Sequence, residues 1–133
     1  MTTGAGVSSP APIILTALLG TADFVWADAL RRAHFPPERN VLRAHLTLFH
    51  HLPPSSEREL RDALRDACRA PAPPARLASL IALGRGVAYR VDSAALSAIR
   101  ACLADRFDTL LTPQDEAGWR AHITVQNLSL IHI

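Results

Sequence analysis

The chain has 133 residues, a formal net charge of +2, and 49% hydrophobic against 20% charged residues. These proportions exclude a wholly disordered chain and fit a single globular domain with a two-layer core. Aromatic residues make up only 5%, which argues against a surface that stacks several RNA bases. All 14 basic residues are arginines, so every cationic contact uses a guanidinium, a group suited to bidentate phosphate binding.

Residues 1–10 are small and polar without a basic segment, so they predict a flexible tail and not a signal peptide. The longest apolar run, residues 11–19, is far too short to span a bilayer. Cys68 and Cys102 form no Cys-x-x-Cys pair, and we expect buried or half-buried free thiols. These features predict a cytoplasmic protein that associates with no membrane, and they indicate no obligate protein partner.

Hydrophobic spacing and turn residues divide the first half of the chain into alternating strands and helices. The predicted elements are a strand over 12–19, a helix over 23–33, a loop over 36–43, a strand over 44–52 and a helix over 56–68. Gly20 ends the first strand, and Thr21 can cap the helix that follows. Ser56 and Glu59 have the spacing of a capping box, which predicts the start of the second helix.

A proline-rich linker over residues 71–74 leads into the second half of the chain. The predicted elements there are strands over 76–83 and 86–91, a helix over 93–107, a loop over 110–118 and a strand over 119–127. The turn Gly84-Arg85-Gly86 joins the first two strands, and Asp92 or Ser93 caps the helix.

One motif occurs twice in the chain. Residues 43–48 read RAHLTL and residues 120–125 read RAHITV. Each copy closes a strand–helix–strand unit, over 12–49 in the first half and 86–126 in the second. Such an internal duplication places equivalent side chains about a pseudo-two-fold axis.

Strand alternation then decides which side chains of the motif share a face. His45 and Thr47 lie on one face, and His122 and Thr124 lie on the matching face of the second copy, together with Gln126. The apolar residues between them bury under helices, so we expect the two polar faces to line a common cleft.

Two histidines in one cleft can divide the acid and base roles near neutral pH, because their unperturbed pKa is about 6.5. Each threonine hydroxyl can donate to a non-bridging phosphate oxygen, and Arg43 and Arg120 add positive potential. This set suits in-line displacement at a phosphodiester without a metal ion. Neither histidine is favoured as the acid or as the base.

The paired motif resembles the His-x-Thr-x signature of the 2H phosphoesterase superfamily, in its branch of bacterial 2′-5′ RNA ligases and RNA 2′,3′-cyclic phosphodiesterases. The resemblance extends over residues 12–127. It implies an α+β fold in which two pseudo-symmetric lobes of mainly antiparallel sheet, with outer helices, surround a central cleft. It also implies metal-independent activity, without a cofactor, on 2′,3′-cyclic or 2′-5′ phosphodiesters of RNA ends or nucleotides. Ligation in the reverse direction stays open.

The resemblance also assigns roles to residues. It implies that His45 and His122 are the catalytic pair and that Thr47 and Thr124 bind the phosphate. Ala121 stands where relatives often have proline before the second histidine, a change in loop stiffness and not in chemistry. Relatives continue into a further C-terminal segment, so we expect a domain over 11–127 that is truncated at its C-terminal end.

Further candidates lie beside the two motifs. His51 has the parity of His45, so it reaches substrate if the strand stays regular, whereas His50 points away. Zinc binding by His45, His50 and His51 is an alternative use of the histidines, although no acidic partner lies in the strand. Gln126 and Arg120 are candidates for contacts with phosphate or ribose. Trp119 and Phe49 either stack on a base or fill the core, and the core is favoured.

Two interpretations concern the chain as a whole. Residues 128–133 resemble the in-frame translation of a transposon-end sequencing adapter, so we interpret them as non-native and exclude His132 from the site. A non-catalytic RNA- or nucleotide-binding module that uses the same cleft is the alternative to an enzyme. A metallohydrolase is a third possibility, which activity in excess EDTA would exclude.

Overall fold

A computed structural model describes residues 10–128 of the chain, so the expectations for residues 1–9 and 129–133 lie outside the described residues. The elements are β1 (Ile13–Ala17), α1 (Thr21–His34), η1 (Pro37–Arg39), β2 (Leu46–Leu52), η2 (Pro54–Ser56), α2 (Glu57–Ala67), β3 (Arg76–Ala82), β4 (Gly86–Asp92), α3 (Ala94–Arg106), η3 (Asp108–Leu110), α4 (Pro113–Glu116) and β5 (His122–Asn127). This element order confirms the predicted α+β class.

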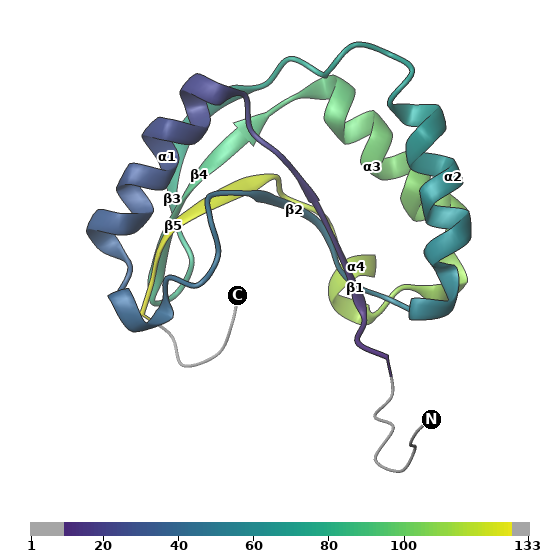
Figure 1. Ribbon diagram of the computed structural model, residues 1–133, viewed down its shortest axis with the longest axis horizontal. Coiled ribbons are helices and arrows are strands. Elements are labelled where there is room, and N and C mark those ends of the chain that lie inside the picture. The colour runs from purple at the N-terminus through teal and green to yellow at the C-terminus, as the bar shows by residue number, and fades with distance from the viewer. Residues whose placement is uncertain (1–9, 129–133) are drawn as a thin grey trace, which may run out of the picture.

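The strands form two antiparallel sheets. One contains β1 and β2, and the other has the strand order β3-β4-β5. Helix α1 packs against β5, whereas α2 and α3 lie side by side at the other end of the molecule (Figure 1). α1 belongs to the unit that ends in β2 but packs against β5, and α3 belongs to the unit that ends in β5 but bonds through Arg100 to the Leu48 carbonyl of β2.

A single core joins the two sheets. The most deeply buried large side chains come from both halves of the chain and include Phe49, Leu52, Phe107 and Ile123. The same cluster contains residues of β2, β4 and β5 together with residues of all three long helices. Burial of this apolar surface is the main driving force for folding, so the two sheets are stabilised together.

The ends of the helices agree only partly with the predicted caps. The Ser93 hydroxyl accepts a hydrogen bond from the Leu96 amide at 3.1 Å and so caps α3 as predicted. Ser56 precedes α2 but makes no capping bond, because its hydroxyl instead donates to the Pro53 carbonyl at 2.6 Å. The capping-box prediction is therefore wrong in its chemistry although the helix begins where expected.

Two other expectations differ from the structure, and a third can be checked against it. The predicted loop over 110–118 contains the short helix α4, which the Thr112 hydroxyl caps. Cys68 and Cys102 are free thiols but are exposed, not buried: Cys68 follows the last residue of α2, and Cys102 lines an open hollow between α2 and α3. Within residues 10–128, no helix is both long and apolar enough to cross a membrane.

Candidate active site

The two His-x-Thr motifs lie on the strands at which the two halves of the molecule meet. His45 directly precedes β2, His122 begins β5, and the two strands contact each other (Figure 1). The intervening apolar side chains are buried, namely Leu46, Leu48, Ile123 and Val125. The motif histidines and threonines are half-buried. The burial pattern therefore matches the predicted division into an apolar face and an open polar face.

Both motif histidines make the same local hydrogen bond. The Nδ1 atom of His45 lies 2.6 Å from the Arg43 carbonyl oxygen, and Nδ1 of His122 lies 2.8 Å from the Arg120 carbonyl oxygen. A carbonyl oxygen only accepts, so each Nδ1 carries the proton, and in the neutral ring the lone pair is on Nε2. The backbone thus fixes one tautomer at both histidines, a form in which Nε2 can exchange a proton with a substrate.

Each motif also contains a β-bulge at the residue after its threonine. In β2, Thr47 pairs with Thr16 and Phe49 with Leu15, which leaves Leu48 as the extra residue. In β5, Thr124 pairs with Ala88 and Gln126 with Val87, which leaves Val125 as the extra residue. Bulges bend a strand and redirect side chains, and they are frequent beside active sites. Their equal position shows that the duplication extends to backbone geometry.

The register shifts affect two further candidates differently: burial still alternates along β5 as far as Asn127, whereas the alternation in β2 ends at Leu48 and Phe49, which are both buried. Gln126 now lies opposite Val87, and its amide nitrogen approaches the His34 carbonyl oxygen at the end of α1 at 3.5 Å. The second register shift in β2 lies between Phe49 and Leu52, so strand parity no longer places His51 beside His45. The side chain of His51 is exposed, and contact of these two residues with substrate stays a prediction.

Two buried arginines bind the backbone of the motif strands across the two halves. Arg31 of α1 donates to the Thr124 carbonyl at 3.1 Å, and Arg100 of α3 donates to the Leu48 carbonyl at 2.9 Å. Each helix belongs to one unit and each carbonyl to the other. The Trp119 indole N–H adds a bond of 3.1 Å to the Thr47 carbonyl. These three bonds tie the backbone beside each motif threonine to a side chain from the other unit.

Both arginines are surrounded by aromatic and acidic groups that compensate for their burial. The guanidinium of Arg31 lies 3.9 Å from the ring centroid of Phe35, and that of Arg100 lies 3.9 Å from that of Phe49. Burial lowers the pKa of both guanidinium groups, while Asp28 beside Arg31 and Asp115 beside Arg100 act in the opposite direction. With a reference pKa this high, both side chains stay charged.

Asp115 on α4 organises the far end of β2. Its carboxylate is 1% exposed and accepts bonds of 2.8 Å from the backbone amides of His50 and His51. The Nδ1 atom of His50 lies 3.2 Å from the same carboxylate. His50 is therefore held by a structural contact. In the described part of the chain, no group of three or more His, Cys, Asp or Glu side chains is placed to hold a metal ion.

The other candidates occupy varied positions. Phe49 is fully buried, and Trp119 is half-buried against the core, which confirms the core assignment of both. Arg120 is exposed just before β5.

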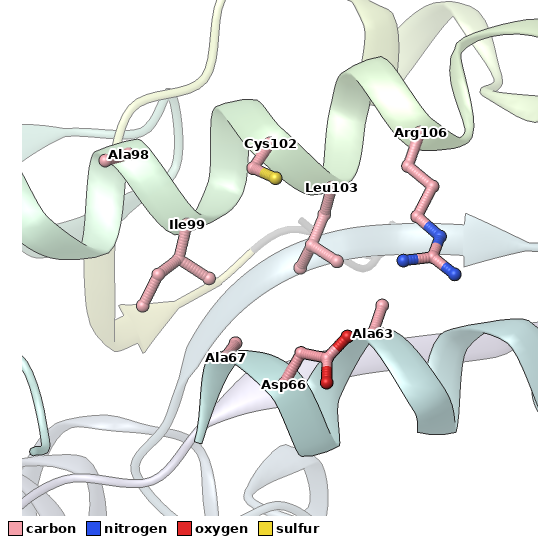
Figure 2. Close-up of a pocket in the computed structure, with 8 residues that line it drawn as sticks. All are labelled: Ala63, Asp66, Ala67, Ala98, Ile99, Cys102, Leu103 and Arg106. Carbon is pink, nitrogen blue, oxygen red and sulfur yellow. The ribbon is translucent and has the colours of Figure 1, made fainter. Parts of the chain in front are cut away.

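A hollow between α2 and α3, lined mainly by apolar side chains with Asp66 and Arg106 at its margin, contains none of the predicted site residues (Figure 2). The candidate site therefore lies at the motif strands and not in this hollow.

Sequence reasoning missed three arginines that surround the motifs. Arg31 and Arg100 follow Ala27 and Leu96 by one helical turn, so both lie on the buried stripe of their helices. The signal available in the sequence was an arginine at a position where the helical period predicts a buried apolar side chain. Arg90, on β4, lies directly opposite His122 of β5. Only the register of the ladder identifies that neighbour.

Comparison with protein-family models identifies the family of the chain. The model of the 2'-5' RNA ligase superfamily matches residues 20–130, a range that contains both motifs. No curated protein matched the chain, and no solved structure did. The match extends over most of the chain and includes the duplicated histidines and threonines. The chain therefore belongs to the 2'-5' RNA ligase superfamily, which is part of the 2H phosphoesterase superfamily.

Proposed function

We propose that this protein hydrolyses 2′,3′-cyclic or 2′-5′ phosphodiester linkages of RNA or nucleotides by acid–base catalysis with His45 and His122. The observation that carries the proposal is the matched backbone hydrogen bond at Nδ1 of both histidines. That bond gives each ring the tautomer needed to accept or donate a proton at Nε2. Family membership supports a phosphoesterase activity of this type.

The proposed reaction begins with a ribose 2′,3′-cyclic phosphate between the two histidines. Nε2 of one histidine takes a proton from water as the water oxygen bonds to phosphorus and the bond from phosphorus to the 3′ oxygen breaks. The other histidine, protonated at Nε2, gives its proton to that departing oxygen. The product is a 2′-phosphomonoester. When the 5′-hydroxyl of a second RNA end takes the place of water as the nucleophile, the same two groups form a 2′-5′ linkage and release the 3′-hydroxyl.

Other side chains of the motifs support this step. The hydroxyls of Thr47 and Thr124 donate to the non-bridging oxygens, where negative charge increases in the transition state. Arg120 adds positive potential, and Gln126 and His51 contribute contacts to the remainder of the substrate. Charge on the phosphate is thus balanced by protein donors, and the proposal includes no metal ion.

The test is hydrolysis of nucleoside 2′,3′-cyclic monophosphates by the wild-type chain and by His45→Ala and His122→Ala, in the presence of EDTA. We expect each variant to lose about 10²–10⁴-fold in kcat, the usual contribution of a general acid or base. Binding of a nucleoside 2′-phosphate should persist in both variants. His34→Ala is the matched control, because His34 is exposed at the end of α1, and it should keep wild-type activity.

Each other outcome contradicts the proposal. Binding without turnover by the wild-type chain indicates the non-catalytic nucleotide-binding module. Activity that EDTA abolishes indicates a metal-dependent hydrolase. Turnover that survives both substitutions shows that the reaction takes place elsewhere. A 3′-phosphomonoester as the sole product shows that the other phosphorus–oxygen bond breaks.

A further inference from the structure

A row of polar side chains crosses the open face of the three-stranded sheet beside His122. Arg90 on β4 lies directly opposite His122 on β5, and Ser79 on β3 lies directly opposite Arg90. Directly opposite residues of antiparallel strands project from the same face. His122, Arg90 and Ser79 therefore form a row perpendicular to the strands.

Arg90 and His122 form a non-hydrogen-bonded pair, the kind of antiparallel pair in which opposite side chains lie closest together. The Val91 amide donates to the Ala121 carbonyl at 2.9 Å, which makes Val91 and Ala121 a hydrogen-bonded pair. The next pair along an antiparallel ladder is non-hydrogen-bonded, and its side chains approach most closely, with Cβ atoms about 4.5–5.5 Å apart. Arg90 is thus an immediate neighbour of a proposed catalytic histidine.

The face that carries Arg90 is not the face covered by α1. Tyr89, the next residue in β4, points to the opposite face, where its ring contacts Trp26 of α1 with a centroid distance of 5.0 Å. The Arg90 side chain is 40% exposed and pairs with Asp92. It is therefore ordered by a carboxylate and still accessible from solution.

Charge on this face favours an anion. Asp92 also accepts a bond of 2.7 Å from Arg76 on β3. Two guanidinium groups thus share one carboxylate, which leaves a net positive charge beside His122. A guanidinium offers five donors in a fixed plane, so a pairing with one carboxylate leaves further N–H groups for a phosphate.

We propose that Arg90 is a specificity-determining residue, which binds the phosphate on the 5′ side of the nucleotide that carries the reacting phosphate. The proposal rests on the proposed function. Because β5 is the edge strand of its sheet and contacts β2, Arg90 lies on the side of His122 turned away from β2. It is one strand, about 4.8 Å, farther from the position between the two motifs. The Arg90 guanidinium is also held by Asp92, two residues farther along β4, so it is placed for the next phosphate of an oligoribonucleotide and not for the reacting phosphate of a mononucleotide.

The experiment compares two substrates and two variants. The substrates are a nucleoside 2′,3′-cyclic monophosphate and a short oligoribonucleotide that ends in the same cyclic phosphate. Arg90→Gln should raise KM for the oligoribonucleotide about tenfold or more, because a charge-assisted bond to phosphate is lost. It should change kcat/KM for the mononucleotide by less than about twofold. Arg61→Gln, which removes an equal charge from an exposed ion pair on α2, should change neither.

A second measurement separates a phosphate contact from a structural role. The affinity for an oligoribonucleotide that ends in a 2′-phosphate is measured at several salt concentrations. Arg90→Gln should reduce the slope of log affinity against log salt by about 0.7, the value for one phosphate contact on a single strand. Arg90→Lys should restore much of that slope, because it keeps the charge.

The outcomes distinguish this inference from the proposed function. Equal losses on both substrates, or no loss on either, would overturn the role of Arg90. If the wild-type chain turns over neither substrate, the proposed function fails, but the salt dependence of binding still tests the role of Arg90. A smaller slope in Arg90→Gln supports a contact between Arg90 and a phosphate, and an unchanged slope overturns it.

Discussion

At the scale of single residues, the Asp115 carboxylate holds two backbone amides of β2, whereas each motif histidine is held by the carbonyl two residues before it. His45 and His122 are recognisable because each occurs in the same six-residue pattern and bonds to a carbonyl two residues before it. Asp115 occurs in no pattern, and its two amide partners are distant in the chain. Strictly local contacts follow from sequence, whereas a long-range contact needs the assembled fold.

We predict that Asp115→Ala strongly destabilises the protein. The substitution leaves the amides of His50 and His51 without an acceptor in a buried place, so the free energy of unfolding should fall by about 3 kcal/mol. Urea denaturation followed by far-UV circular dichroism measures this loss. Glu116→Ala, at the adjacent exposed position of α4, should change stability by less than about 0.5 kcal/mol. Equal effects of the two substitutions would contradict the role assigned to the Asp115 carboxylate.

At the level of strands and helices, the structure joins two sheet edges without a direct ladder between them. β2 and β5 contact each other but belong to different sheets. Arg31 and Arg100 instead supply donors to the carbonyls of Thr124 and Leu48. These carbonyls lie at or next to the bulges, so the arginines fix the backbone that carries the motif threonines.

Arg100→Met should therefore cost more than an exposed arginine on the same helix. The variant leaves the carbonyls of Leu48 and Asp115 without a donor and removes the cation–π contact with Phe49. We expect a loss of about 3 kcal/mol in the free energy of unfolding and a lower kcat. Arg106→Met, which removes only an exposed pair with Glu59, should cost less than about 1 kcal/mol. A stable Arg100→Met variant with wild-type kcat would refute this positioning role.

The whole molecule is held together by an exchange of helices between its two repeated units. α1 lies on the sheet that contains β5 (Figure 1). Arg100 of α3 bonds to the Leu48 carbonyl of β2. The core cluster includes residues of both sheets. Because each unit provides the cover of the other, neither sheet keeps its buried face if the other unit unfolds.

Unfolding should consequently be a single cooperative transition in both halves. Trp26 of α1 contacts Tyr89 of the three-stranded sheet, and Trp119 bonds to Thr47 of the two-stranded sheet. Each tryptophan therefore reports on the unfolding of a different sheet. In Trp26→Phe and Trp119→Phe, the midpoint of fluorescence in urea should coincide with the midpoint of far-UV circular dichroism in the same variant. Separate midpoints in either variant would show that the halves unfold independently.

The sequence by itself determined the order of the main elements and the duplicated motif with its open and buried faces. These follow from hydrophobic period and from the local spacing of residues, which need no distant partner. The tertiary structure alone decided the bulges after Thr47 and Thr124, the crossed arginines, and Arg90 beside His122. Each of these depends on strand register and on helix placement across units, and both arise only when segments distant in the chain pack together.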